Sequence, residues 1–361
     1  MKTTDLKTRL NKRLELTGKF AGIIPQMIST IDQLNLKWQY EKHPAPEYFD
    51  KLEKTAIITS AGASNRIENI ILTDDEVAVL FAGLNVKNHT TRDELEVAGY
   101  LDLLNQIFEN YKNIKFSLNT ILGFHSQMYK YSKYDENHRG KLKMIHNKIV
   151  AKDADGNGIA ILHNPTEPYL VAIEINELLR WTNESLQSKN YHQLLVIANF
   201  VIEFLAIHPF LDGNGRMSRI LTVFLLLKEG YEFAKYSSHE KIIEETKAGY
   251  YLALRKGQAK WKTQNEDIQI WLEYFLGIVE KQGLHALALA RKVEINKVLS
   301  EKQNLIYKAL QRNQLLSRRE IVKITQINVE TVKQAVNKLV KLNLIERIGE
   351  GRATRYRILN A

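Results

Sequence analysis

Residues 208–219 read HPFLDGNGRMSR and stand between two apolar runs, at 194–207 and 220–227. Apolar runs on both sides of a short polar stretch predict a helix, a tight loop and a second helix. Two glycines flank Asn214 and free the backbone there to point several N–H groups at one place, which makes an anion-binding nest. The second helix is expected to begin near Gly215, where its N-terminal dipole adds to the same anion site.

The charged residues of this stretch indicate phosphate chemistry. Arg216 and Arg219 are three residues apart in the second predicted helix, so they share a face. Asp212 offers the hard oxygen that a divalent cation prefers, and His208 offers an imidazole that accepts a proton near neutral pH. A buried helix pair with a satisfied histidine is the alternative, but it explains neither the two arginines nor the aspartate beside an apolar run. The stretch therefore predicts a site for a polyphosphate with a divalent cation.

The same residues resemble the signature of the Fic (filamentation induced by cAMP) family, HPF-x-(D/E)-G-N-(G/K)-R-x-x-R, at every defined position. The resemblance implies a mainly α fold, with a Fic-type helical bundle core and a β-hairpin flap. It also implies a protein adenylyltransferase, a nucleotidyltransferase that moves AMP to a Ser, Thr or Tyr hydroxyl of a target protein or of itself. ATP is then the substrate and Mg²⁺ the cofactor.

The resemblance gives each signature residue a role. His208 would be the catalytic base toward the target hydroxyl, and Asp212 would be the metal ligand for Mg²⁺. The residues that bind the phosphates of ATP would be Gly213, Asn214, Gly215, Arg216 and Arg219. The glycine turn would cradle the α- and β-phosphates. The first arginine would neutralise the charge that grows there during displacement, and the second would hold the γ-phosphate.

A β-hairpin is predicted at 146–163, because apolar runs flank a turn that contains Asp-Gly and Asn-Gly. It stands at the position of the family's flap, which aligns the backbone of the target by strand addition. The flap residues that would face the target are Asn147, Lys148, Ile149 and Val150. Just before them, Gly140-Lys141-Leu142-Lys143 stands where many members have an arginine, which leaves the target unassigned.

Residues 247–254 resemble the Tyr-Tyr-x-Ala-Leu helix that lines the family's adenine pocket. Tyr250 and Tyr251 would offer flat faces to the base, and Gln258 stands where members often have an asparagine. Plain helix packing of the two tyrosines is the alternative interpretation.

The segment Ser64-Asn65-Arg66-Ile67-Glu68-Asn69 resembles the family's inhibitory motif, (S/T)-x-x-x-E-(G/N). Ser64 and Glu68 are four residues apart and therefore lie on one helical face. The resemblance implies that Glu68 pairs with Arg219 and denies this arginine to the γ-phosphate. An exposed glutamate near a helix end is the alternative. The motif predicts that the Glu68→Gly variant transfers more AMP.

Composition limits the remaining classes of protein. Cysteine is absent, which excludes disulfides, thiol chemistry and Cys metal sites. No run reaches 18 apolar residues and the N-terminus has no apolar signal core, so no membrane partner and a cytoplasmic location are expected. The net charge of +10 comes from residues 281–361, which hold 17 Lys and Arg against 6 Asp and Glu, whereas residues 1–280 hold 34 against 35. This asymmetry indicates a separate basic module.

Three domains are expected: an N-terminal helical region with the inhibitory helix at 1–95, the Fic catalytic core at 96–280, and a winged helix-turn-helix at 285–361. The last rests on helices expected at 301–312, 317–323 and 329–342, followed by a basic hairpin over 344–358. DNA would be contacted by the third helix and the wing, through Lys333, Asn337, Lys338, Lys341, Arg352, Arg355 and Arg357. Winged helices also serve as docks for proteins, which is the alternative.

Two other functions are compatible with these patterns. One is a DNA-binding transcriptional regulator whose Fic core senses nucleotide, although an intact His208 argues against a purely sensory core. The other is a Fic enzyme that removes AMP or transfers another phosphate group. Relatives that phosphorylate typically carry Ala-Asn-Lys-Arg where residues 213–216 read Gly-Asn-Gly-Arg, so this loop favours AMP transfer. A homodimer is expected because the family often dimerises.

Overall fold

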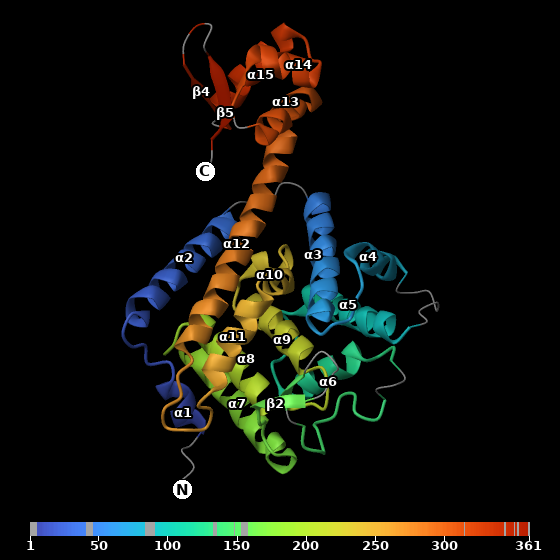
Figure 1. Cartoon of the computed structure of the whole chain (residues 1–361), viewed down its shortest axis with the longest axis vertical. Helices are drawn as coiled ribbons and strands as arrows, with labels where there is room; N and C mark the ends of the chain where they lie inside the picture. The colour runs from blue at the N-terminus through green and yellow to red at the C-terminus, as the bar shows by residue number, and fades with distance from the viewer. Residues whose placement is uncertain are drawn as a thin grey trace. The chain divides into compact units, whose positions relative to one another are not determined.

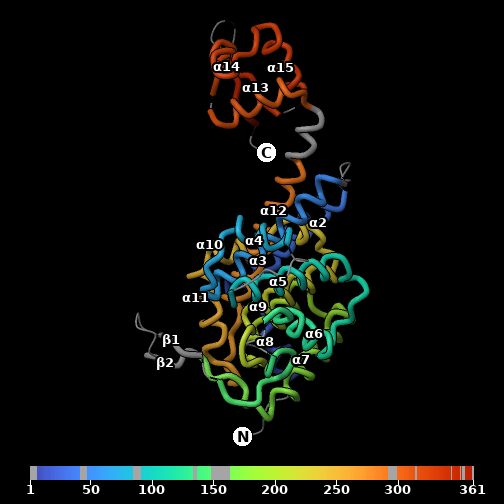
Figure 2. Tube along the Cα trace, turned by 90° about the vertical axis from the view of Figure 1, so that its right-hand side faces the viewer, coloured from blue at the N-terminus to red at the C-terminus, as the bar shows by residue number. Residues whose placement is uncertain are grey.

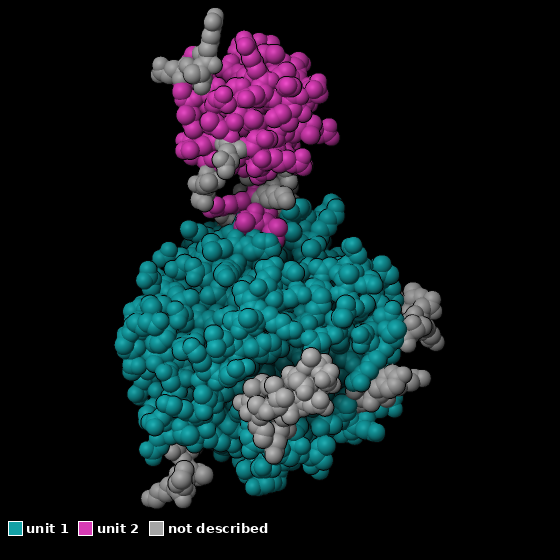
Figure 3. Space-filling view, viewed as in Figure 1, with its two compact units in different colours: residues 1–287 teal, residues 288–361 magenta. Residues whose placement is uncertain are grey.

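The computed structural model describes residues 6–40, 46–83, 91–132, 136–147, 149–152, 158–313, 315–342, 344–349, 351 and 354–359. The chain divides into two compact units, Met1–Leu287 and Ala288–Ala361, which Figure 3 shows in different colours. The described elements are mainly helices, as the sequence predicted. Among the described residues, no helix is both long and apolar enough to cross a membrane.

The first unit begins with four helices, α1 (Leu6–Lys12), α2 (Phe20–Tyr40), α3 (Pro46–Ile67) and α4 (Asp74–Ala82). Helix α3 runs unbroken through Gly62, and the predicted inhibitory motif lies at its end. Thr73 caps α4 and forms a reciprocal capping box with Glu76. Helix α3 packs against α4, α5 and α10, so the motif is held against the core of this unit.

The core of the first unit consists of α5 (Arg92–Asn110), α6 (Leu118–Met128), α7 (Pro168–Ser188), α8 (Gln193–Ile207) and α9 (Asn214–Lys228). The apolar runs around the signature form α8 and α9, and α8 is buried from Leu194 to Ile207. Helix α8 packs against both α7 and α9, and Figures 1 and 2 show α8 and α9 in the middle of the unit. The burial of these helices fixes both ends of the loop between them.

The predicted hairpin is present as β1 (Ile149–Lys152) and β2 (Gly158–His163), which pair antiparallel with Ile149 opposite His163. Residues 153–157 of its turn lie outside the described residues. The first unit ends with the 3-10 helix η2 (Glu232–Lys235) and helices α10 (His239–Glu245), α11 (Lys247–Gln258) and α12 (Gln269–Val298). The last residues of α12 belong to the second unit.

The second unit contains α13 (Glu301–Arg312), β3 (Leu316–Ser317), α14 (Arg318–Thr325), α15 (Val329–Lys341), β4 (Ile345–Ile348) and β5 (Arg355–Ile358). These elements agree closely with the ranges that the sequence predicted. Ser317 and Glu320 form the capping box of α14, and the strands form an antiparallel sheet in the order β3-β5-β4. The helices and the sheet share one apolar core around Ile306, Val336 and Tyr356.

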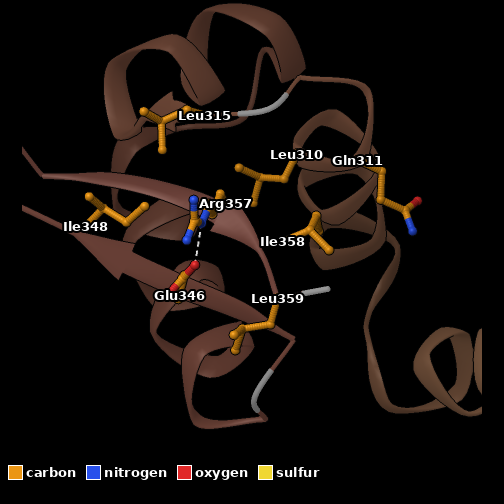
Figure 4. A pocket seen from close by; sticks show the side chains of 8 residues that line it. All are labelled: Leu310, Gln311, Leu315, Glu346, Ile348, Arg357, Ile358 and Leu359. Atoms are coloured by element: carbon orange, nitrogen blue, oxygen red, sulfur yellow. Dashed lines mark hydrogen bonds and ion pairs between the residues drawn. The ribbon is translucent and has the colours of Figure 1, made fainter. Parts of the chain in front are cut away.

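A groove of about 1060 Å³ lies in the second unit, between α13 and the strands β4 and β5. Its lining is Leu310, Gln311, Leu315, Glu346, Ile348, Arg357, Ile358 and Leu359, as Figure 4 shows. Glu346 and Arg357 form an ion pair across the two strands (Figure 4). The groove contains no residue of the 208–219 loop.

Candidate functional site

His208 follows the last residue of α8 and ends the helix in the left-handed conformation, with φ of +53°. Its backbone N–H donates to the Phe204 carbonyl at 2.9 Å. This bond fixes the position of His208 at the end of the buried helix. The side-chain amides of Asn147 and Asn214 both place their nitrogen 3.1 Å from Nδ1 of His208. An amide N–H only donates, so Nδ1 accepts and a neutral ring carries its proton on Nε2.

Burial lowers the pKa of His208 to about 3, and the charge of Lys143 and the neighbouring His163 act in the same direction. Asp212 acts in the opposite direction but does not outweigh them. The imidazole is therefore neutral at physiological pH, and its basic lone pair is the one on Nδ1, to which the two amides donate.

The glycine turn holds the loop next to α9. Gly213 has φ of +77°, and a Cβ there would collide with Met128 and Tyr129, so only glycine fits. Asn214 accepts from the Phe210 N–H at 2.9 Å through Oδ1 and donates to the Phe210 carbonyl at 2.8 Å. These bonds fold the loop back over the start of α9, where the N-terminal N–H groups of a helix favour an anion.

Asp212 presents a half-exposed carboxylate at the edge of this turn, with a side-chain exposure of 52%. Oδ1 accepts from the Gly213 N–H at 2.7 Å, and Oδ2 accepts from the Tyr129 hydroxyl at 3.0 Å. Burial raises the pKa of Asp212, but the charge of Arg216 and these hydrogen bonds outweigh it and lower the pKa. An ionised, accessible oxygen suits Mg²⁺, which commonly uses one or two carboxylates together with phosphate oxygens and water. No cluster of three or more potential ligands occurs among the described residues.

Arg216 is almost completely buried and is held by partners from three other helices or helix ends. Nη1 lies 2.6 Å from the Glu96 carboxylate and 3.3 Å from Oδ1 of Asn65. Nη2 donates to the Tyr129 hydroxyl at 2.6 Å. Burial opposes the charge of this guanidinium, but Tyr129, Glu96 and Asp212 raise its pKa above the ordinary value. The arginine is thus a fixed cation beside Asp212.

Arg219 is also buried, and the end of the α3 segment supplies its partners. Nε donates to the Ser64 hydroxyl at 2.8 Å, and Nη2 donates to the Ser64 carbonyl at 2.9 Å. Nη2 also lies 2.8 Å from Oε1 of Glu68. A Cβ at Gly215 would collide with this Oε1, so the Glu68 carboxylate lies directly against the first turn of α9. The Glu68 side chain therefore lies at the predicted anion site.

The structure describes the predicted flap residues only in part. Asn147 turns its amide toward His208 and also donates to the Phe210 and Leu211 carbonyls. Lys148 lies outside the described residues, and only the backbone of Ile149 and Val150 is described, in β1.

Tyr250 is buried and interacts with Ser218 and Arg219, whereas Tyr251 is 39% exposed. The two rings meet edge to face with centroids 5.2 Å apart. Gln258 is partly buried, and its Nε2 has no hydrogen-bond partner among the described residues.

Three residues of the site escaped sequence reasoning: Glu96, His125 and Tyr129. The His125 ring stacks on Phe210 with centroids 3.8 Å apart, accepts from the Gly140 N–H at 2.8 Å, and lies 3.1 Å from the Asp212 carbonyl. His125 therefore packs against the loop and holds it in place. Burial lowers the pKa of His125 to about 4. Glu96 gave no clear signal in the sequence, because α5 also carries Asp93, Glu94, Asp102 and Glu109.

These features define a helical domain in which a glycine turn and two buried arginines lie at the N-terminal end of α9, with a neutral histidine beside them. Residues 94–226 match the sequence model of the Fic/DOC family, and they form a Fic/DOC family domain within the chain.

Protein adenylyltransferases are among the relatives of this domain. The Fic protein adenylyltransferase of Drosophila mojavensis is 41% identical over 69 residues, which are 19% of this chain and 14% of that protein. The protein adenylyltransferase and cysteine protease IbpA of Histophilus somni is 37% identical over 87 residues, which are 23% of this chain and 2% of that protein. The chain thus spans only a small part of the length of these curated relatives.

Solved structures share the fold. A Fic family protein from Desulfovibrio desulfuricans G20 superposes with a TM-score of 0.62 at 20% identity, covering 97% of this chain and 98% of that one. A fragment of Fic-1 from C. elegans superposes with a TM-score of 0.58 at 16% identity, covering 76% of this chain and 74% of that one. At these identities the solved structures show the shared fold.

Proposed function

We propose that the chain is an auto-inhibited protein adenylyltransferase that transfers AMP from ATP to a Ser, Thr or Tyr hydroxyl of a target protein or of itself. The observation that carries the proposal is the contact of Glu68 with Arg219 at 2.8 Å. Arg219 belongs to the same 208–219 stretch as the neutral His208. The end of the α3 segment then inhibits the site through Arg219 of α9. The adenylyltransferase relatives support the reaction class.

The residues of the loop suit an in-line displacement at the α-phosphorus. His208 takes the proton of the target hydroxyl as the oxygen bonds to that phosphorus, and the bond to the β-phosphate oxygen breaks, so pyrophosphate leaves. Arg216 and the start of α9 stabilise the negative charge that develops on the phosphate oxygens. Asp212 is the residue that would hold Mg²⁺, which when bound supplies further positive charge at the phosphates.

Inhibition follows from charge and space at Arg219. The Glu68 carboxylate accepts a hydrogen bond from the Arg219 guanidinium and lies against Gly215. A γ-phosphate would need both this N–H group and this space. A carboxylate and a phosphate repel each other there. A charge-assisted hydrogen bond of this kind is worth about 1.5–3 kcal/mol, so its removal is expected to raise AMP transfer by about tenfold to a hundredfold.

The test compares the parent with Glu68→Gly and with Glu68→Gly/His208→Ala, each incubated with Mg²⁺ and ATP labelled at the α- or the γ-phosphate. We expect α-label on protein in the Glu68→Gly variant, less in the parent, and a loss of about 10²- to 10⁴-fold without His208. Glu47→Gly is the matched control, because Glu47 is an exposed glutamate in the first turn of the same helix α3.

The other outcomes are equally decisive. Transfer of the γ-label would make the chain a kinase-like member, and release of AMP from a pre-modified protein by the parent would favour the removal reaction. Equal rates for the parent and Glu68→Gly, with both folded, would contradict the inhibition.

DNA binding by the second unit is a second candidate function, supported by the surface of α15. The exposed residues of this helix include Lys333, Asn337, Lys338 and Lys341, with Glu330 as the nearby acidic residue. Such a face suits the phosphates of a duplex, as in a winged helix-turn-helix. Retention of labelled duplex DNA by the full chain in a gel shift at low salt would support this function, and no shift would contradict it.

Two of the strand arginines predicted for this surface form ion pairs within the second unit. Arg355 pairs with Glu320 at 3.3 Å, and Arg357 pairs with Glu346, while Arg352 lies outside the described residues. The competing interpretation, a dock for a protein, would use the groove beside these strands, where Leu315 and Leu359 are partly exposed.

A further inference from the structure

Lys143 is a buried cation next to the catalytic loop. Its side chain is 3% exposed, although lysine is almost never fully buried without a partner charge. Nζ donates to Oδ1 of Asn147 at 2.9 Å and lies 3.5 Å from the Ile207 carbonyl, while the backbone N–H donates to the Pro209 carbonyl at 2.9 Å. Lys143 therefore contacts the residues immediately before and after His208.

The hydrogen-bonding roles along this chain of groups are fixed by chemistry. A lysine ammonium only donates, so the amide oxygen of Asn147 faces Lys143 and the amide nitrogen faces away. That nitrogen reaches Nδ1 of His208 at 3.1 Å and the carbonyls of Phe210 and Leu211 at 3.2 and 3.3 Å. One amide thus ties the imidazole to the loop that follows it, and Lys143 holds this amide in place.

We propose that Lys143 is a positioning residue for His208, acting through Asn147, which it holds against the imidazole while its own charge disfavours a cationic ring. The role of Lys143 in AMP transfer rests on the proposed function, whereas its role in positioning the His208 ring does not. Asn214 makes the same contact to Nδ1 from the other side, and its orientation is set independently by Phe210.

Several other charged and titratable groups act on this pair. Those acting on His208 besides Lys143 are His163 of β2 and Asp212, and those acting on Lys143 are Glu167, Glu174 and Lys262. Burial lowers the pKa of Lys143 to about 8, so the amine is still mostly protonated at pH 7. Its positive charge then opposes protonation of the neighbouring ring, and its removal should make His208 easier to protonate.

The first measurement is an NMR titration of the His208 ring between about pH 6 and pH 9 in the full chain with ¹⁵N-labelled histidine. In the parent we expect the ring signals to shift as Lys143 loses its proton, and Lys143→Met should abolish this shift. Lys141→Met is the matched control, because Lys141 is an exposed lysine of the same loop, and it should leave the shift unchanged. A shift that persists in Lys143→Met would overturn the proposal even if no variant transfers AMP.

The second measurement is a double-mutant cycle for AMP transfer in the Glu68→Gly background. Lys143→Met and Asn147→Leu should each lower kcat by about tenfold with little change in the KM for ATP, and the double variant should be no worse than Asn147→Leu alone. Multiplied losses would show that Lys143 does not act through Asn147. Absence of transfer in Glu68→Gly itself would count against the proposed function, and the NMR titration would still decide the positioning role.

Discussion

The start of α9 and the exposed face of α15 both carry cations, yet their surroundings are opposite. Arg216 and Arg219 are buried, and each is paired with a carboxylate from another part of the chain. Lys333 and Lys338 are exposed; Lys333 lies 3.7 Å from Glu330, and Lys338 donates to Gln303 at 3.2 Å.

The difference shows how each region uses positive charge. A buried cation must be paired, because removing a charge from water costs several kcal/mol. The partners then fix its geometry, which a reaction requires. An exposed cation needs no partner and stays available to a polyanion, at the cost of sensitivity to salt. Net charge reveals only the second kind: residues 1–280 sum to about zero, although they hold the proposed phosphate site.

Acidification should give the largest difference in stability between the two units. All ten histidines precede Ala288, so only the first unit can lose stability through histidine. Burial lowers the pKa of His125 and His239 to about 4 and that of His208 to about 3. In the unfolded chain these rings take up a proton near pH 6.5, so the unfolded state binds more protons below that pH and stability falls as the pH drops. We expect a loss of about 2 kcal/mol for each of these rings between pH 7 and pH 5.

Tryptophan fluorescence measures this loss in the first unit, which holds all four tryptophans. Urea unfolding at pH 7 and pH 5 gives the free energies, and amide NMR signals follow the second unit, which should lose no stability through histidine. A free energy of unfolding for the first unit that is equal at the two pH values would show that these rings are not neutral when folded.

The charge pair behind Arg216 gives the next largest effect. Glu96 is 4% exposed and contacts both Arg216 at 2.6 Å and Arg92 at 2.7 Å. Glu96→Gln keeps the shape but leaves the guanidinium without its carboxylate, so we expect a loss of about 3–5 kcal/mol from the free energy of unfolding. The same fluorescence measurement checks it. Glu109→Gln on the exposed face of α5 is the control, and a Glu96→Gln loss as small as that of the control would contradict this role.

The sequence was informative wherever the determinants are local. Apolar runs predicted α8 and α9 around the 208–219 loop, and capping residues such as Thr73 and Ser317 marked the starts of α4 and α14. The positions of α13 to α15 and of the last two strands followed from the same kind of signal.

Contacts between distant segments were harder to predict. Glu96 is 120 residues away from Arg216, and a single carboxylate on an amphipathic helix looks like an ordinary surface charge. Tyr129 and His125 follow an apolar pattern that any core helix has. The resemblance to an inhibitory motif indicated Ser64 and Glu68, because a motif carries information on distant partners that periodicity lacks. Asn147 was expected at the flap edge that faces the site, but its particular contact with His208 could not be read from the sequence.

The salt dependence of DNA binding gives the smallest expected effect, and it directly tests the role of the exposed cations in the comparison. If the α15 lysines contact DNA phosphates, each contact releases counterions, so log Kd against log salt concentration changes slope by about 0.9 for each contact. Replacing Lys333, Lys338 and Lys341 with alanine should lower the slope by about 2–3 and weaken binding about tenfold at moderate salt, equally for unrelated duplexes. The control removes the same charge from exposed lysines of the first unit, Lys19, Lys37 and Lys51. If the control lowers the slope as much as the α15 variant, the effect is one of net charge and α15 is not the contact surface. A fall confined to the α15 variant would mean that the exposed cations of this chain bind a polyanion, while its buried cations serve the reaction.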